Sequence, residues 1–214
     1  EAISKLAKSA KITPAQLDFF DIAGLVEGAS RGEGLGNQFL AHIREVDAIA
    51  LVLRCFESAD VDHGGRADPV ADAETVETEL MLADLESLER RLDPLVKKAR
   101  GGDKHAIAMQ AMVERATVLL RDGRPARELD IDKDDIGLFH QMQLLSAKPV
   151  LYVCNVDEDS AAHGNAQSAR IAEWASRAGA PSVIVSAAIE ADIATLEDAA
   201  ERAASEGWWV DRAN

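Results

Sequence analysis

The sequence contains no long apolar run, few cysteines and few aromatic residues. No stretch reaches the roughly 18 consecutive apolar residues of a membrane span, so we expect no membrane partner and a cytoplasmic protein. The two cysteines, Cys55 and Cys154, stand in apolar stretches, which predicts buried, reduced thiols; a redox-sensing pair is the alternative. No cysteine or histidine has the spacing of a metal site, so no structural zinc is expected.

Basic residues are also scarce relative to acidic ones. The 214 residues include 23 Lys and Arg against 38 Asp and Glu, a net charge of −15. This balance argues against broad, nonspecific binding to nucleic acid, which needs a basic surface, although it leaves room for a local basic patch. With 47% apolar and 29% charged residues, the composition is that of a globular domain, alone or with an insertion. Because the first residue is Glu1 rather than Met, we expect a fragment of a longer protein.

Short apolar segments alternate with helical patterns along most of the chain. Strands that alternate with helices predict an α/β fold with a mainly parallel sheet. The expected strands are Leu17–Ile22, Ala48–Cys55, Val150–Asn155 and Ser182–Ser186. The expected helices between and after them are Asn37–Val46, Ala166–Ala178 and Ala194–Glu206.

Residues 74–120 have no strand signal and instead predict an antiparallel helical hairpin between the second and third strands. Gly101-Gly102 ends the first helix and Asp103 can cap the second, while Pro94 predicts a kink. Apolar residues that step by four and three give each helix one apolar side. They are Met81, Leu85, Leu88, Leu92 and Leu95 in the first helix, and Ile107, Ala111 or Met112, Ala116 and Leu119 in the second.

A possible phosphate-binding motif, Asp21-Ile22-Ala23-Gly24, follows the first expected strand. A carboxylate at the end of a strand can hold Mg²⁺ through water, and the Gly24 N–H group can approach a terminal phosphate. The glycine-rich loop that follows could cradle a phosphate or act as a switch. A strand-ending turn and a plain flexible loop are the alternatives. The residues of this expected switch loop are Gly24, Leu25, Gly28, Gly32, Gly34 and Gly36.

Two further motifs follow the third and fourth expected strands. Asn155-Val156-Asp157-Glu158 offers an amide that can bond a purine ring and tie loops together, and a carboxylate that can accept from ring N–H donors. Ser186-Ala187-Ala188 offers backbone N–H groups to a purine edge. Open α/β sheets bind ligands at the carboxyl ends of their strands, so these motifs predict one site, although each alone is also an ordinary turn.

These motifs together resemble the Obg-like ATPases, the YchF subfamily of P-loop GTPases. The likeness is strongest over D-I-A-G-L-V-E-G-A-S-R-G-E-G-L-G-N-Q-F-L-A-H-I-R-E at residues 21–45, and it covers roughly residues 5–200. Shorter matches are R-C-F-E at 54–57, T-E-L-M-L-A-D-L-E at 78–86, K-K-A-R-G-G-D-K at 97–104, N-V-D-E at 155–158 and S-A-A-I-E-A-D-I-A at 186–194.

The resemblance implies a nucleotide-hydrolysing G domain with a helical insertion, acting with Mg²⁺ on ATP in preference to GTP. It places the nucleotide at Gly24, Asn155, Val156, Glu158, Ser186, Ala187 and Ala188, and Mg²⁺ at Asp21. Leu25 replaces a water-orienting glutamine, so we expect His63 to orient the water, with a solvated loop histidine as the alternative. The ribosome is the implied partner, and a monomer is expected. The expected parts are residues 1–72 and 146–206 for the G domain, 73–145 for the insertion and 207–214 for a tail.

The sequence departs from the family in lacking G-x-x-x-x-G-K-[ST], the loop that binds phosphate, and the C-terminal TGS domain. We therefore expect this chain alone to bind nucleotide poorly. A noncatalytic module that binds protein or RNA through the hairpin is the alternative, and a degenerate or chimeric copy is a third. In the hairpin, a basic tip provides the possible contact, although a solvated helix end is the simpler explanation. Its cations are Lys97, Lys98, Arg100 and Lys104, against Asp103.

Overall fold

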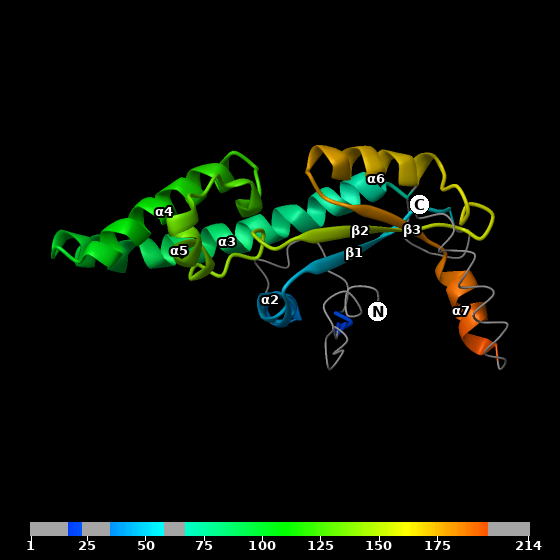
Figure 1. The fold of residues 1–214 in the computed structure, drawn as a ribbon, viewed down its shortest axis with the longest axis horizontal. Coiled ribbons are helices and arrows are strands. Elements are labelled where there is room, and N and C mark those ends of the chain that lie inside the picture. The colour runs from blue at the N-terminus through cyan, green and yellow to red at the C-terminus, as the bar shows by residue number, and fades with distance from the viewer. Residues whose placement is uncertain (1–16, 23–34, 58–66, 197–214) are drawn as a thin grey trace, which may run out of the picture.

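The computed structural model describes residues 17–22, 35–57 and 67–196, and the structural statements below refer to these residues (Figure 1). In chain order the elements are α2 (Leu35–Glu45), β1 (Ile49–Arg54), α3 (Pro69–Arg100), α4 (Lys104–Arg121), α5 (Ile136–His140), β2 (Val150–Asn155), α6 (Ala166–Arg177), β3 (Ser182–Val185) and α7 (Ala187–Thr195). Two short 3₁₀ helices, η1 (Ala126–Glu128) and η2 (Lys133–Asp135), lie between α4 and α5. Within these ranges no helix is long and apolar enough to cross a bilayer.

The three strands form one parallel sheet in the order β1-β2-β3, as expected for an α/β fold. Leu53 of β1 lies in register with Cys154 of β2, which in turn lies in register with Ile184 of β3. Each of the three strands begins or ends within one residue of its predicted bounds. Continuous apolar segments are typical of strands in parallel sheets and made these strands easy to find, although the described helices cover only one face of this sheet.

The prediction of a strand at Leu17–Ile22 is wrong. These residues form no strand in the structure, and residues 17–21 are exposed, 76% for Leu17 and 78% for Phe19. Ile22 is partly buried and packs against the cluster formed by α2 and α3. An apolar segment becomes a strand only when a neighbouring strand completes its hydrogen bonds, and the described sheet pairs only β1, β2 and β3. The predicted helix at 194–206 lies mostly outside the described residues, and the helix after β3 begins earlier, at Ala187.

One face of the sheet is covered by α6 and the first half of α3 (Figure 1). Ile171 and Ala175 of α6 and Ala73 of α3 pack on the buried strand residues, and Trp174 contacts Tyr152 edge to face with ring centroids 4.9 Å apart. Among the described residues no helix covers the other face. Val52, Val153 and Val183 form one row across it, with Val52 64% and Val183 41% exposed.

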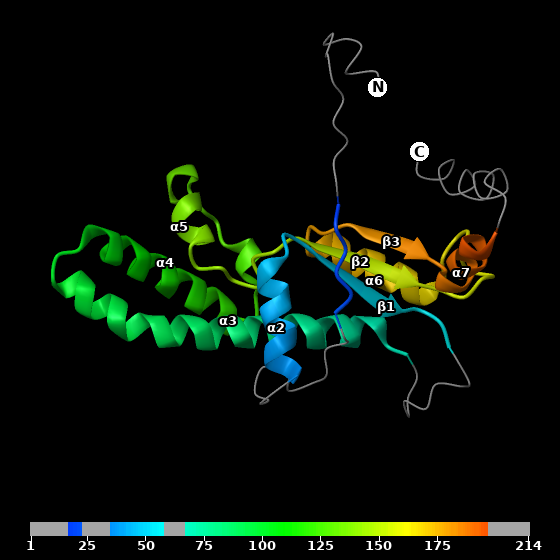
Figure 2. The ribbon, with the colours of Figure 1, turned by 90° about the horizontal axis from the view of Figure 1, so that it is seen from below.

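The helical hairpin is present as predicted and extends away from the sheet (Figures 1 and 2). Asp103 caps α4 by accepting hydrogen bonds from the backbone N–H groups of His105 and Ala106, at 2.9 and 3.1 Å. Gly102, at φ +85°, makes the turn that follows α3. Helix α3 continues through Pro94, so this residue does not end the helix. The expected boundary at residue 73 falls inside α3, which serves both the sheet and the hairpin.

The predicted apolar seam of α3 is confirmed, because Leu88 is buried and Met81, Leu85, Leu92 and Leu95 pack around it. On α4 the buried side is formed by Met112, Val113, Ala116 and Leu120. Ile107 is the exception to the predicted stripe: it is 49% exposed, because the preceding residue, Ala106, takes the buried side of α4 at this turn. Helix α2 crosses α3 near its middle, where Leu40 and Ile43 meet Leu80 and Ala83 (Figure 2).

Two buried carboxylates of α3 attach this helix to the rest of the chain. Asp84 accepts hydrogen bonds from the backbone N–H groups of Leu145 and Ser146, at 2.7 and 2.8 Å, and from the Ser146 hydroxyl at 2.7 Å. Glu77 accepts two bonds from the Arg127 guanidinium, at 2.6 and 2.7 Å, and one from the Tyr152 hydroxyl. Together they hold the segment that returns from the hairpin, and strand β2, against α3.

Candidate nucleotide site

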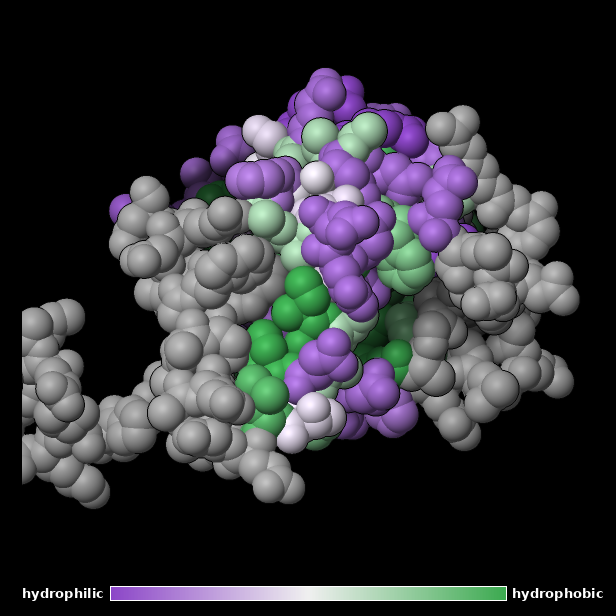
Figure 3. Space-filling model, turned by 90° about the vertical axis from the view of Figure 1, so that its right-hand side faces the viewer, coloured by the Kyte–Doolittle hydropathy of each residue, from purple (hydrophilic) through white to green (hydrophobic). Residues whose placement is uncertain are grey.

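The candidate site lies at the carboxyl ends of the parallel strands, where the loops after β1, β2 and β3 come together. Figure 3 looks at the molecule from this side. Polar residues occupy the upper part of the view and apolar residues gather below them, on the side away from α6. This edge is where an open parallel sheet presents backbone N–H groups and loop side chains to a ligand.

A side-chain hydrogen bond joins the loops that follow β2 and β3. The Asn155 side-chain oxygen accepts from the Ala187 backbone N–H group at 3.0 Å. One residue further, the Val156 N–H group donates to the Val185 carbonyl at 2.8 Å, which continues the strand pairing into the loop. The two motifs that the sequence analysis assigned to one site are therefore adjacent in the structure.

Ser186 lies at the centre of this junction and is fully buried. It precedes the first turn of α7, yet its side chain makes no capping hydrogen bond, and its hydroxyl oxygen has no partner within the described residues. Ala187 and Ala188, the first residues of α7, are exposed beside it. Small exposed residues at the start of a helix allow a ligand to approach the backbone closely.

The loop after β2 is held by its own turn. The Asp157 carboxylate accepts from the Ser160 N–H group at 2.8 Å, so Asp157 serves the loop itself. Glu158 is exposed next to it. Of the two carboxylates, Glu158 is thus the one that remains available at the edge of the site.

Helix α6 holds both ends of the segment that separates β1 from α3. Asn165 caps α6 and also donates from its side-chain nitrogen to the Cys55 carbonyl at 2.6 Å. Gln167 donates to the Ala67 carbonyl at 3.3 Å. The sequence analysis missed these two residues. The signal was Asn165 with Ser168 three residues later, a capping-box pattern at the start of a helical segment.

Cys55 and Cys154 lie beneath the site as buried, free thiols, as predicted. The hydrogen bond with Cys154 and burial together raise the pKa of the Cys55 thiol above its ordinary value. The thiol of Cys55 therefore stays protonated at neutral pH, and a thiol is a poor nucleophile. The same hydrogen bond lowers the pKa of the Cys154 thiol, although burial opposes this shift. Burial of both thiols favours a packing role, and the redox-sensing alternative stays a prediction for Cys154.

Comparison with known proteins identifies the family to which this architecture belongs. A family model described as 50S ribosome-binding GTPase matches residues 4–80. The ribosome-binding ATPase YchF of Pasteurella multocida is 44% identical over 199 residues, which cover 92% of this chain and 54% of that protein. The Bacillus subtilis YchF is 41% identical over 200 residues. The Obg-like ATPase 1 of Oryza sativa subsp. indica is 40% identical over 185 residues.

The solved structure of the Schizosaccharomyces pombe YchF GTPase matches with a TM-score of 0.77 and 31% identity, over 97% of this chain and 57% of that one. The chain belongs to the YchF/Obg-like ATPase family. Its sheet and helices therefore form a P-loop G domain. The chain spans about half the length of the curated YchF relatives that it matches.

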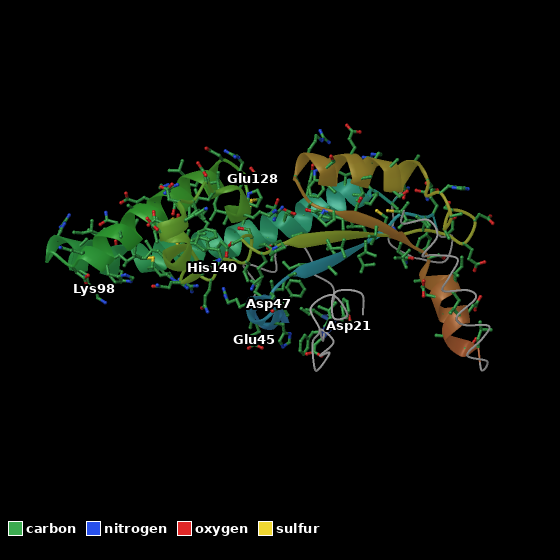
Figure 4. All side chains as sticks on the ribbon, viewed as in Figure 1. Asp21, Glu45, Asp47, Lys98, Glu128 and His140 are labelled. Carbon is green, nitrogen blue, oxygen red and sulfur yellow. The ribbon has the colours of Figure 1, made fainter. Side chains whose placement is uncertain are left out.

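Several residues that the YchF resemblance implies for the site fall outside the described part of the chain. They are Gly24, Leu25, Gly28, Gly32, Gly34 and His63. Gly36, expected in the switch loop, instead belongs to the first turn of α2. Asp21 is exposed, and no contact given by the structure joins it to the loops after β2 and β3 (Figure 4).

The described residues offer Mg²⁺ a single candidate ligand rather than a cage. No group of three or more His, Cys, Asp or Glu residues in these ranges could hold a metal ion. Mg²⁺ in nucleotide sites takes one or two carboxylates and completes its shell with water and substrate phosphates. A single carboxylate such as Asp21 would therefore need water and nucleotide phosphates to complete a Mg²⁺ shell.

Proposed function

We propose that this chain is the nucleotide-reading part of a Mg²⁺-dependent ATPase that acts as a switch on the ribosome in the cytoplasm. The observation that carries the proposal is the hydrogen bond between the Asn155 side chain and the Ala187 N–H group, which joins two loops at the carboxyl edge of a parallel sheet. The names of the relatives, ribosome-binding ATPase and Obg-like ATPase, support the same activity and partner.

The preference for ATP over GTP is implied by the resemblance to the family, and the loop after β2 supports weaker selection of guanine. GTPases carry N-K-x-D here, where the aspartate pairs with guanine, whereas this chain has Asn155-Val156-Asp157-Glu158. Glutamate is one methylene longer than aspartate, so the Glu158 carboxylate is displaced from the position that selects guanine. The Ala187 N–H group is already bonded to Asn155, so the exposed Ala188 beside it leaves room for a backbone contact with adenine.

Calorimetry with ATP and GTP in the presence of Mg²⁺ tests this proposal. Because the chain has no G-x-x-x-x-G-K-[ST] loop, we expect weak binding by the 214 residues alone. A longer protein that supplies this loop should bind ATP at least tenfold more tightly than GTP. Asn155→Ala in that longer protein should weaken binding of both nucleotides, since the loop after β3 loses its support. Absence of nucleotide binding in the longer protein, or a preference for GTP, would refute the proposal.

We also propose that His63 orients the attacking water, in place of the glutamine replaced by Leu25. His63→Ala in the longer protein should lower the turnover of ATP about tenfold or more and leave the dissociation constant unchanged, because only the transition state uses the water. His163→Ala, a change at an exposed histidine, is the control and should turn over normally. Unchanged turnover in His63→Ala would remove the residue from the mechanism.

A further inference from the structure

The tip of the helical hairpin, which we define as residues 97–105, concentrates exposed positive charge. Lys97, Lys98, Arg100 and Lys104 are all exposed, and Asp103 is the only acidic residue among them. Within the described ranges none of the four cations has an ion-pair partner, whereas five arginines elsewhere are paired with carboxylates. The tip is thus an unneutralised basic patch on a chain of net charge −15.

Stabilisation of the helices does not account for this patch. Cations in the last turn of α3 favour that helix through its dipole, which explains Lys97, Lys98 and Arg100 in part. Lys104, however, begins α4, and its first turn contains no acidic residue. A positive charge at the start of a helix is unfavourable by the same dipole argument. The Asp103 carboxylate, which caps α4, offsets part of this unfavourable charge, and a ligand with negative charge would offset more of it.

The hairpin presents these charges far from the rest of the molecule. Helix α3 is 32 residues long, which corresponds to about 48 Å at 1.5 Å per residue. Lys98 lies at the end opposite to the carboxyl edge of the strands (Figure 4). Gly101 and Gly102 form the turn, and no side chain there limits the approach of a large partner. Because the rest of the chain is acidic, electrostatic forces will orient an approaching polyanion toward the basic tip.

We infer that the hairpin tip binds the phosphate backbone of structured RNA. A protein partner would need a large apolar or aromatic anchor at the centre of the contact, and residues 97–105 contain no Phe, Tyr, Trp, Leu, Ile, Val or Met. The exposed Ile107 lies beyond the four cations rather than among them. Phosphate contacts need only cations and accessible backbone, which the tip supplies. This inference names a contact for the ribosomal association in the proposed function, yet it requires neither nucleotide binding nor hydrolysis.

Fluorescence anisotropy with a labelled 24-base-pair RNA duplex tests the inference on the 214-residue chain, without nucleotide. The wild-type chain should bind, with an affinity that falls as KCl rises from 50 to 200 mM. Lys97→Ala/Lys98→Ala should weaken binding at least tenfold and reduce the slope of log K against log salt by roughly 2, since each lost phosphate contact contributes about 0.9 to that slope.

The matched control removes two exposed cations from elsewhere in the chain. Lys133→Ala/Arg177→Ala changes the net charge equally and should leave affinity within twofold of wild type. Circular dichroism and the melting temperature should be unchanged in both variants. Three results would overturn the inference: no RNA binding at 50 mM KCl, equal losses of affinity in the two variants, or displacement of RNA by poly-L-glutamate. Displacement by poly-L-glutamate would assign the tip to acidic proteins. RNA binding in the chain together with no ATP binding in the longer protein would instead refute the proposed function alone.

Discussion

Asp84→Ala should lower the free energy of unfolding by about 3 kcal/mol, one of the two largest effects that we expect in this chain. The side chain is buried and accepts three hydrogen bonds, from the Leu145 and Ser146 N–H groups and from the Ser146 hydroxyl. Alanine leaves these donors without an acceptor in a site that solvent does not reach. Urea unfolding followed by circular dichroism measures the change.

Two other substitutions distinguish the hydrogen bonds from the charge. Asp84→Asn retains one acceptor oxygen and should cost less than Asp84→Ala, about 1–2 kcal/mol. Asp93→Ala, at an exposed position of the same helix, should change stability by less than about 0.5 kcal/mol. If Asp84→Ala were as stable as Asp93→Ala, the three hydrogen bonds would contribute nothing to folding.

The charge on Asp84 has its own signature in the pH dependence of stability. Burial raises the pKa of this carboxyl above its ordinary value of 3.8, although the hydrogen bonds from Ser146 and Leu145 oppose the shift. The native state then holds the proton more tightly than the unfolded chain. Between 3.8 and the raised native value, this group makes stability fall as pH rises. Asp84→Asn has no such titration and should lose this pH dependence. The stability difference between wild type and Asp84→Asn should therefore shrink as pH rises through this window, because only the wild type loses stability from this group.

The parallel sheet and the hairpin could be predicted from sequence because each leaves a periodic apolar signal. The buried strand segments and the seam around Leu88 are such signals. The meeting of Asn155 with Ala187 also followed from a general rule, that parallel strands end at one edge. The error at Leu17–Ile22 arose because apolarity alone does not supply a neighbouring strand.

The buried polar contacts were not predicted, because hydrophobic periodicity does not report partners distant in sequence. Glu77 and Asp84 are one heptad apart, and Asp84 falls between Met81 and Leu88 of the apolar seam. Two acidic residues on the buried side of a helix were the available signal. Their partners, Arg127 and Ser146, lie 50 and 62 residues away in the chain, and only the fold shows the pairing.

Glu77→Ala should destabilise the chain by about 3–4 kcal/mol, because it leaves the Arg127 guanidinium buried without its carboxylate. The two side chains are only 9% and 14% exposed and lie 2.6 Å apart. The Tyr152 hydroxyl loses the same acceptor, and burial together with Glu77 raises the pKa of that phenol, which remains a neutral donor. Chemical unfolding at neutral pH gives the measurement.

The chain contains a matched pair against which this effect can be judged. Arg121 and Glu89 join α4 to α3 at 2.8 Å, but their side chains are 61% and 51% exposed. Glu89→Ala should therefore cost less than about 1 kcal/mol, since water screens the pair and solvates the remaining arginine. Similar losses for Glu77→Ala and Glu89→Ala would show that burial does not amplify the contact.

A double-mutant cycle separates the attraction within the buried pair from the cost of a stranded charge. Glu77→Ala/Arg127→Ala should be less destabilising than the sum of the single changes, by about 2 kcal/mol, because no unpaired charge remains in the double variant. Strict additivity would mean that the two residues stabilise the fold independently. Coupling of the expected size would instead mean that Glu77 connects β2 to the segment that returns from the hairpin, through Tyr152 and Arg127. Strand β2 carries Asn155 at its end. The edge of the sheet that carries the candidate site and the segment returning from the hairpin would then share one buried contact.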